Sequence, residues 1–499
     1  MLLENLLMGF ACVFQVQSLI GLMIGTVMGY FVGSMPGLTP SIGIALIVPF
    51  TFGMDPVVAM VMLVSLYIAA EYGGGITAIL INCPGTPAAA ATAWDGYPMA
   101  QRGEAGKALA ISVVSSFTGS VISSILLILT AIPMARFALS FGPLEYFALA
   151  VFGLSLVSSL SSGSLLKGFL GMFFGLLIAT IGLDPVNGVP RFALTPALFE
   201  GIPFLPALIG LFAMSEVFFM LENADENPVN IQNIKGIGIP FSLYRKLGFV
   251  LARSSLLGYI IGVIPGAGAT IASLISYNET RRVAKDKSTF GKGNPAGISA
   301  SEAANNSAVA GAMAPLLALG VPGSASAAIM IGALTIQGLQ PGPLLFTNNP
   351  EIPYSIFIAL LTAAPIMLCL GLAGVRLWAK VTLIPKGILA VVVSGISILG
   401  AYSFSNSMHT VWVTLCFGLI GYMMRKVEIP TAPVVLALVL GFMAEVNFRR
   451  AIVVSHGDFS FIFDKPIAIV LLIVSLLTLI IPLVQQLKSK PKVKCSENI

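Results

Sequence analysis

The sequence predicts an all-α integral membrane protein, and three observations support this fold class. Hydrophobic residues make up 57% of the chain and charged residues only 9%, whereas soluble domains carry roughly 25% charged residues. The mean hydropathy is +0.96. Apolar stretches of about 18 or more residues recur along the chain, and each is long enough to span the roughly 30 Å hydrocarbon core as a helix.

We expect about 11–13 transmembrane or re-entrant helices, because some of the apolar segments will not cross the membrane fully. The expected spans lie near residues 8–33, 56–72, 105–132, 143–161, 165–183, 202–221, 247–264, 304–320, 354–375, 387–403, 409–424, 430–446 and 465–486. Before the first span the chain carries Glu4 and no Lys or Arg. It lacks the basic start of a cleavable signal, so we expect a retained membrane helix.

Basic residues predict which ends of the helices face the cytoplasm. Lys488, Lys490, Lys492 and Lys494 follow the last expected span. Short Lys- and Arg-rich segments stay on the cytoplasmic side, so we expect a cytoplasmic C-terminus and place the basic loop 281–293 on the same side. The net charge of +5 follows from this bias and indicates no nucleic-acid partner.

Four Pro-Gly pairs interrupt apolar segments in a repeated arrangement. They are Pro36-Gly37, Pro84-Gly85, Pro265-Gly266 and Pro322-Gly323. The separation along the sequence between Pro36 and Pro265 nearly equals the separation between Pro84 and Pro322. We call the separation of the third pair from the first the first repeat offset, and that of the fourth pair from the second the second repeat offset. Because the two offsets are nearly equal, they predict two related halves. We assign the first half to residues 1–222, a polar linker to 223–244, and the second half, with extra C-terminal helices, to 245–499.

The Pro-Gly pairs predict interrupted helices that bind a ligand. Proline ends a helix, and the freed backbone groups are tolerated in a membrane only where they are buried in protein or line a polar cavity. The start of the following half-helix favours an anion such as a carboxylate, while the carbonyls ending the preceding one can bind a cation. Short hydroxyl side chains follow the breaks at Thr39, Ser41, Thr86, Thr270, Ser324 and Ser326. The alternative is ordinary kinks, because Pro and Gly are common in membrane helices.

Two further segments carry polar residues within apolar surroundings. Glu71 precedes three glycines and is a candidate proton carrier or cation ligand, although it could instead lie in water at the interface. Glu302, Asn305 and Asn306 fall within one helical turn, which suits cation coupling or, alternatively, hydrogen bonds between helices. By contrast, we interpret Asp95-Gly96 as a structural surface turn.

Motifs for catalysis and cofactors are lacking. The sequence contains no P-loop, HExxH or GxSxG motif, and its five cysteines and two histidines form no cluster. We therefore expect neither an enzyme nor a cofactor. Energy would come from a sodium or proton gradient or from downhill flow.

Five motifs resemble one known family along residues 20–465. They are "GSMPGLTPSIGIALIVPFTFGMDP", "EYGGGITAILINCPGTPAAAATAWDGYPMAQRGEAGKAL", "GVIPGAGATIASLISYNETRR", "SEAANNSAVAGAMAPLLALGVPGSASAAIMIGALTIQGLQPGP" and "SHGDFSFIFDKP". Together they resemble the large membrane subunit of the bacterial tripartite tricarboxylate transporter family. Two residues depart from the family pattern. Thr39 stands where the second half has Gly268, and Cys83 stands where we expect an aliphatic residue.

The resemblance implies a three-part uptake system in the bacterial inner membrane. A small four-helix membrane subunit would accompany this chain, and a periplasmic substrate-binding protein would deliver a tricarboxylate or another small organic carboxylate. Transport would be secondary, with sodium or protons, and all four Pro-Gly motifs would face the substrate. The alternatives are an autonomous carboxylate carrier, a passive anion channel and a membrane-embedded enzyme, for which Glu71 and Glu302 are the candidate catalytic pair.

Overall fold

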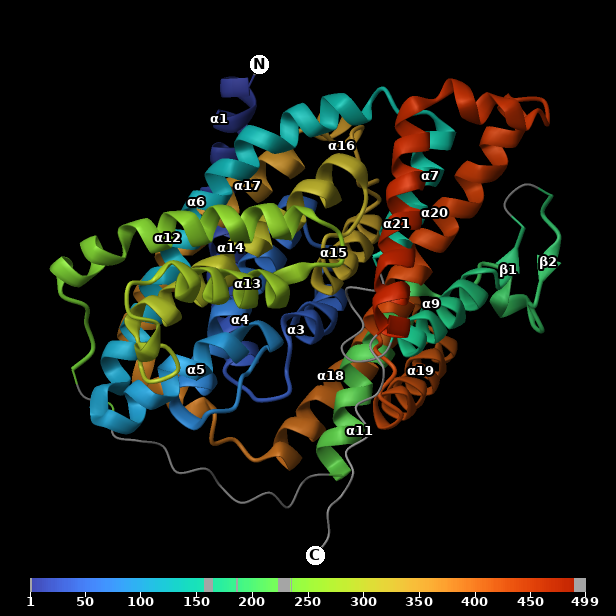
Figure 1. Cartoon of the computed structure of the whole chain (residues 1–499). Helices are drawn as coiled ribbons and strands as arrows, with labels where there is room; N and C mark the ends of the chain where they lie inside the picture. The colour runs from blue at the N-terminus through green and yellow to red at the C-terminus, as the bar shows by residue number, and fades with distance from the viewer. Residues whose placement is uncertain (1, 157–164, 185–186, 223–233, 235, 489–499) are drawn as a thin grey trace, which may run out of the picture. The chain divides into compact units, whose positions relative to one another are not determined.

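A computed structural model describes the chain except residues 1, 157–164, 185–186, 223–233, 235 and 489–499 (Figure 1). The described residues are mostly helical, which confirms the all-α class. Among them, eight helices are long and apolar enough to cross a membrane, and six further apolar helices are shorter. The lysine-rich tail beyond Lys488 and most of the polar linker lie outside the described residues.

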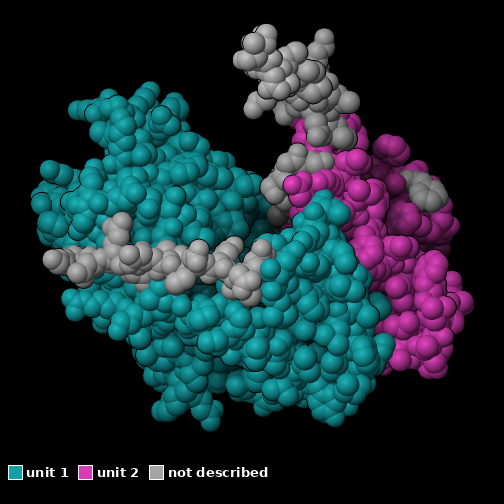
Figure 2. All heavy atoms as spheres, turned by 90° about the horizontal axis from the view of Figure 1, so that it is seen from below, with its two compact units in different colours: residues 1–140, 202–427 teal, residues 141–201, 428–499 magenta. Residues whose placement is uncertain are grey.

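The described chain forms two compact units, shown in Figure 2. Unit 1 comprises residues 1–140 and 202–427, and unit 2 comprises residues 141–201 and 428–499. The contacts that define these units cut across the halves expected from the Pro-Gly motifs. The division into halves at residues 222 and 245 stays a prediction.

Unit 1 holds most of the helices. Its first group is α1 (Leu2–Val13), α2 (Val16–Gly33), α3 (Pro40–Ile47), α4 (Pro56–Ile81), α5 (Ala90–Met99), α6 (Ala105–Ala138), α10 (Phe204–Leu208) and α11 (Ser215–Glu222). Its second group is α12 (Phe241–Val263), α13 (Gly268–Val283), α14 (Pro295–Leu319), α15 (Ala325–Ile336), α16 (Leu345–Asn348), α17 (Glu351–Val381), α18 (Lys386–Ser405) and α19 (Met408–Lys426). Short 3₁₀ turns are η1 (Val48–Thr51), η2 (Pro87–Ala89) and η6 (Lys287–Thr289), and π-helical turns are η3 (Ala100–Glu104) and η5 (Ile209–Met214).

Helices α4 and α14 form the core of unit 1. Helix α4 packs along α2 and α17, and α14 packs along α6, α12 and α13 (Figure 1). Each begins at a strong capping signal, because Asp55 and Asn294 accept backbone N–H groups and a proline occupies the first helical position. Nearly every residue of both helices is buried. Their polar side chains are therefore held inside protein.

Several expected spans have different bounds in the structure, and three of them are informative. The span expected at 8–33 is divided into α1 and α2, because the chain turns at Phe14 and Gln15. The span expected at 56–72 continues as α4 to Ile81, since the three glycines do not end the helix. The span expected at 304–320 begins earlier, at Pro295, because small and polar residues in the first turns of α14 lower its hydropathy.

Unit 2 contains four helices and a small sheet among its described residues. They are α7 (Pro143–Ser155), α9 (Leu165–Ala179), α20 (Ala432–Val454) and α21 (Pro466–Lys488), with antiparallel β1 (Gly182–Leu183) and β2 (Pro190–Arg191) and the 3₁₀ turns η4 (Pro196–Leu198) and η7 (Phe459–Asp464). Ion pairs join the sheet region to α20. Arg191 lies 2.6 Å from Glu445, and Arg449 lies 2.7 Å from Asp184.

Candidate functional site

All four Pro-Gly pairs lie in breaks between helices of unit 1, as predicted. The first and third pairs separate α2 from α3 and α12 from α13. Gly37 and Gly266 have φ values of +94° and +81°, which favour glycine. The second and fourth pairs follow α4 and α14, whose ends at Asn82 and Gly320 are left-handed.

Backbone hydrogen bonds hold the breaks of both halves, and in the second half they join the two breaks to each other. The N–H of Gly85 donates to the carbonyl of Gly74 in α4 at 3.1 Å, and the N–H of Gly266 donates to the carbonyl of Gly323 at 3.1 Å. These bonds satisfy backbone groups that the breaks would otherwise leave unpaired. The breaks are consequently ordered parts of the core.

The packing of α2 on α4 recurs in the packing of α12 on α14. Gly33 packs against Ala70, and Gly262 against Ala308. Likewise, Gly29 packs against the backbone of α4 at Leu66, and Gly258 against α14 at Ala304. The glycines of the two halves are related by the first repeat offset and their partners by the second. Small residues let both helix pairs approach closely.

The starts of α3 and α15 come together, although they belong to opposite halves. The hydroxyls of Ser41 and Ser326 share a hydrogen bond of 2.9 Å. At the first turn of each helix, Thr39 Oγ1 accepts the N–H of Ile42 at 3.4 Å, and Ser324 Oγ accepts the N–H of Ala327 at 3.1 Å. We call this region the α3/α15 end; it brings together four of the six hydroxyl residues predicted for the site.

Tyr67 of α4 is a member of this end that the sequence analysis missed. Its hydroxyl lies 2.9 Å from Ser324 Oγ, and the ring is buried. Its position in α4, one helical turn before Glu71, places both side chains on one side of that helix. That spacing was a usable signal, but an aromatic residue in an apolar helix is usually part of the core.

The remaining two predicted hydroxyls, Thr86 and Thr270, lie where η2 packs against α13. No hydrogen bond joins them in the described structure. Instead, Ala88 packs against Ala269 and Ala272. Thr86 is 1% exposed, and its Oγ1 has no hydrogen-bond partner among the described residues. We call this region the η2/α13 end.

Three consecutive glycines give α4 close neighbours on three sides. A Cβ on Gly73 would lie 2.9 Å from Gly33 Cα, and one on Gly74 would lie 2.6 Å from Thr86 Oγ1. A Cβ on Gly75 would lie 2.7 Å from Glu302 Oε1. Glycine is therefore required at all three positions, because the end of α2 at Gly33, the loop that holds Thr86 and the Glu302 carboxylate each approach this turn of α4.

The four predicted cation-coupling residues lie on α4 and α14, which face each other here. Glu302 is fully buried, and its carboxylate accepts hydrogen bonds from Thr92 at 2.6 Å and Ser116 at 2.9 Å. Asn305 Nδ2 donates to the Glu71 carbonyl, and Asn306 Nδ2 donates to the Ile68 carbonyl, both at 3.1 Å.

Glu71 is 6% exposed, so the alternative that it lies in water at the interface does not hold. Its Oε2 has no hydrogen-bond partner among the described residues, and neither do the Oδ1 atoms of Asn305 and Asn306. The region therefore presents several buried oxygen atoms that are free to accept a ligand.

An ion pair that the sequence analysis missed lies beside the first break. Glu216 of α11 pairs with Arg425 of α19 through Oε2, and its Oε1 lies 2.5 Å from where a Cβ on Gly37 would stand. Arg425 also lies over the Phe219 ring, 3.7 Å from its centroid. Isolated charges in helices far apart along the chain gave no signal that they would meet.

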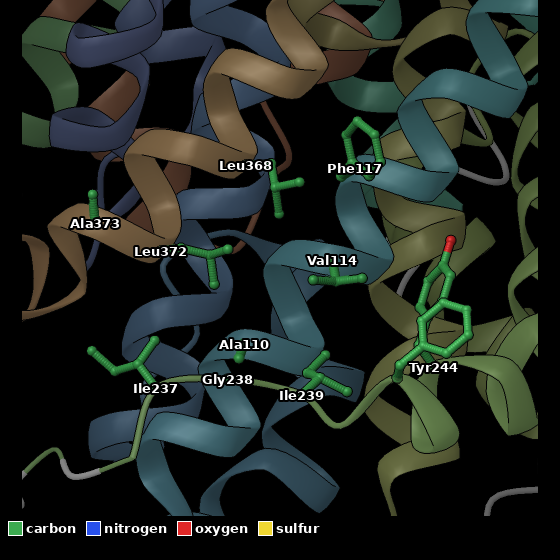
Figure 3. Close-up of a pocket in the computed structure, with 11 residues that line it drawn as sticks. Ala110, Val114, Phe117, Ile237, Gly238, Ile239, Tyr244, Leu368, Leu372 and Ala373 are labelled. Carbon is green, nitrogen blue, oxygen red and sulfur yellow. The ribbon is translucent and has the colours of Figure 1, made fainter.

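An apolar pocket of about 680 Å³ lies elsewhere in unit 1 (Figure 3). Its lining comes from α6, α17, the segment that leads into α12 and the first turn of α12, with Val114, Leu372, Ile239 and Tyr244 among its residues. None of the predicted site residues lines it. Apolar surface of this kind suits lipid better than a carboxylate.

Comparison with known proteins gives concordant matches. Residues 19–436 match the model of the tripartite tricarboxylate transporter TctA family. A protein of Agrobacterium vitis, described as an uncharacterized 52.8 kDa protein in the TAR-I ttuC' 3'region, is 35% identical over 490 residues, or 98% of either chain. Another from that organism, an uncharacterized protein in the TAR-II ttuC' 3'region, is 33% identical over 233 residues, covering 47% of this chain and 96% of its own. No solved structure gives a significant match.

Proposed function

Since the chain belongs to the tripartite tricarboxylate transporter TctA family, we propose that it is the large membrane subunit of a binding-protein-dependent secondary transporter that imports a small organic carboxylate. The family and the apolar helices make it a multi-pass transporter subunit. The substrate, the coupling ion and the partner subunits are the parts that this proposal adds.

The α3/α15 end is the observation that carries the proposal. Two helix N-termini converge there, and each favours negative charge. Ser41, Ser326, Ser324 and Tyr67 add hydroxyls that bond to one another and can turn to donate to a carboxylate. These hydroxyl groups carry no charge, so a buried anion would be bound by helix dipoles and neutral hydrogen-bond donors.

Coupling to a cation is supported by the buried oxygens on α4 and α14. Glu71, Glu302, Asn305 and Asn306 offer carboxylate and amide oxygens away from water. Carboxylates and carbonyl oxygens suit hard cations. A sodium ion or proton bound here would accompany the anion and offset part of its charge.

Alternating access would use the interrupted helices. Helix α13 folds back along α12, since Arg253 in the middle of α12 donates to Thr280 near the end of α13 at 2.8 Å. We propose that residues 241–283 form a re-entrant hairpin whose tip, Pro265-Gly266, meets Pro322-Gly323 at the core. Rocking around such tips exposes a fixed site to one side and then the other.

The expected partners are a small four-helix membrane subunit and a periplasmic substrate-binding protein. Lipid would cover the exposed apolar side chains of the outer helices, and the apolar pocket of Figure 3 offers it a groove. The proposed location is the bacterial inner membrane, with the C-terminus in the cytoplasm.

Uptake into proteoliposomes tests the proposal. The chain and its small partner would be reconstituted, and labelled citrate and other carboxylates would be offered with and without the binding protein under a sodium or proton gradient. Saturable uptake that needs both gradient and binding protein is expected. Gradient-dependent uptake without the binding protein would indicate an autonomous carrier, and flux that ignores gradient and saturation would indicate a channel. Chemical turnover of a substrate in detergent would indicate an enzyme.

Ser324→Ala tests the site within the same assay. Loss of one hydrogen bond to a charged ligand costs about 1.5–3 kcal/mol, so the KM for the carboxylate should rise about 10-fold or more. Ser394→Ala, at a partly exposed position of α18 away from the site, is the matched control and should leave the KM unchanged. Equal KM values for the two variants would contradict the assignment of the site.

A further inference from the structure

We propose that the two equivalent ends of the core bind different ligands: a sodium ion between Thr86 and Asn305 at the η2/α13 end, and the carboxylate at the α3/α15 end alone. The inference deepens the proposed function and rests on it for the identity of the anion. It reassigns Thr86, which the sequence analysis grouped with the substrate residues.

The second repeat offset pairs the residues of one end with those of the other. By this offset Ser324 corresponds to Thr86, and Asn305 corresponds to Tyr67. Around them the packing is equivalent, because a Cβ on Gly85 would lie 2.8 Å from Gly74 Cα and one on Gly323 would lie 2.6 Å from Ala312 Cα. The surroundings match, so differences between the ends come from the side chains.

At the α3/α15 end the hydroxyls satisfy each other. Tyr67 and Ser324 are joined at 2.9 Å. At the η2/α13 end the corresponding pair is Asn305 and Thr86, and neither Asn305 Oδ1 nor Thr86 Oγ1 has a partner among the described residues. An amide side chain is shorter than a phenol, so the same backbone spacing leaves room between these two oxygens.

Both side chains lie against one turn of α4, from Glu71 to Gly75. Thr86 packs on Gly74, and Asn305 Nδ2 donates to the Glu71 carbonyl. Because that carbonyl can only accept, the amide nitrogen must face it, which directs Oδ1 away from the backbone of α4. Asn305 is fully buried and Thr86 is 1% exposed, so water does not reach either from the surface.

Acidic side chains are distributed unequally between the two ends. Glu71 and Glu302 flank the Gly73–Gly75 turn, and no Lys or Arg forms a salt bridge with either among the described residues. Beside the α3/α15 end, the nearby carboxylate of Glu216 is already paired with Arg425. The η2/α13 end thus has two acidic groups without a basic partner, which disfavour an anion there. Of these two, only Glu71 also lies near the α3/α15 end, one helical turn from Tyr67 on α4.

The available atoms favour a metal cation over a proton. A hydroxyl oxygen, an amide oxygen and the free Oε2 of Glu71 are oxygen ligands of the type that hard cations take. The first two do not titrate near neutral pH. By the two repeat offsets Ser41 corresponds to Thr270 and Ser326 to Ala88, so the η2/α13 end has one hydroxyl where the other end has the bonded pair Ser41 and Ser326.

Thermal unfolding of the purified chain in detergent tests the sodium site without transport. The melting temperature would be followed against NaCl, with choline chloride keeping ionic strength constant. Wild type should gain stability with sodium. Thr86→Val keeps the shape and removes the oxygen, and it should raise the sodium concentration for half-maximal stabilisation about 10-fold or more. Glu71→Gln, which removes charge alone, should shift the same curve.

Ser324→Ala is the matched control at the equivalent position. It should leave the sodium curve within about 2-fold and weaken stabilisation by citrate at saturating sodium, while Thr86→Val should leave the citrate curve unchanged. The inference is overturned if wild type shows no sodium shift, if Thr86→Val leaves the sodium curve unchanged, or if Ser324→Ala shifts it equally. If the sodium results hold but no carboxylate is taken up by proteoliposomes, the proposed function fails and the cation site stands.

Discussion

Gly37 shows how one residue serves both the backbone and a neighbouring charge. Its φ of +94° lies in the turn between the end of α2 at Gly33 and the start of α3 at Pro40. The space that a side chain would fill is occupied by the Glu216 carboxylate, whose other oxygen pairs with Arg425. The first break therefore depends on α11 and α19 as well as on its own sequence.

Gly37→Ala should be more destabilising than the same change at Gly53. Both residues have left-handed backbones, and alanine costs about 1–2 kcal/mol there. Only at Gly37 must a carboxylate also move, since nothing lies within 4 Å of a Cβ on Gly53. Melting temperatures in detergent measure the difference. Equal losses of stability at the two positions would show that the contact with Glu216 does not affect the free energy of unfolding.

Asp95 corrects an expectation at the same scale. The Asp95-Gly96 pair was interpreted as a surface turn, but Asp95 is fully buried within α5. Its Oδ1 accepts the N–H groups of Gly293 and Asn294, both at 2.8 Å, and its Oδ2 accepts the Tyr277 hydroxyl at 2.9 Å. The partners lie in the opposite half of the chain, so local turn preference could not reveal them.

At the scale of elements, Asp95 joins α5, α13 and the loop before α14. Asp95→Asn keeps one accepting oxygen and loses the charge, so we expect a loss of about 1.5–3 kcal/mol in the free energy of unfolding. Asp286→Asn is a suitable control, because the hydrogen bonds of Asp286 to Ser288 lie in an exposed loop. Chemical denaturation would compare them. Equal stability of the two variants would mean that the buried carboxylate adds nothing to this junction.

The close packing of two helix pairs is a second feature at the scale of elements. The α2/α4 and α12/α14 pairs approach through glycines whose Cβ atoms would meet the partner backbone. Without a hydrophobic drive between helices in lipid, such close approach supplies much of the association. The equivalence of the two pairs is what brings the four breaks into register.

Gly258→Leu should disrupt the second pair, because a Cβ there would lie 2.6 Å from Ala304 Cα. Overpacking costs about 1–3 kcal/mol or more, so the yield of monodisperse protein on size exclusion should fall. Gly29→Leu, its equivalent in α2, should do the same. Gly248→Leu on the exposed face of α12 has nothing within 4 Å and should be tolerated. A normal yield of the Gly258 variant would refute the close-packing argument.

For the whole molecule, local signals predicted what depends on local chemistry. Apolar length predicted the membrane class, and Pro-Gly pairs predicted the interrupted helices because both residues act on the backbone they occupy. The meeting of α3 with α15, the role of Tyr67 and the Glu216–Arg425 pair depend on contacts between distant segments. Nothing in the neighbouring sequence specifies such contacts.

The hydrogen bonds of the α3/α15 end connect parts of the chain that are far apart in sequence. Ser41 and Ser326 are 285 residues apart, and Tyr67 and Ser324 are 257 apart. A molecule held by both sides would be a removable cross-link around a very long loop, and closing such a loop costs entropy that grows only with the logarithm of its length. Binding of such a molecule would hold the early and late parts of the chain together, and its release would remove that connection.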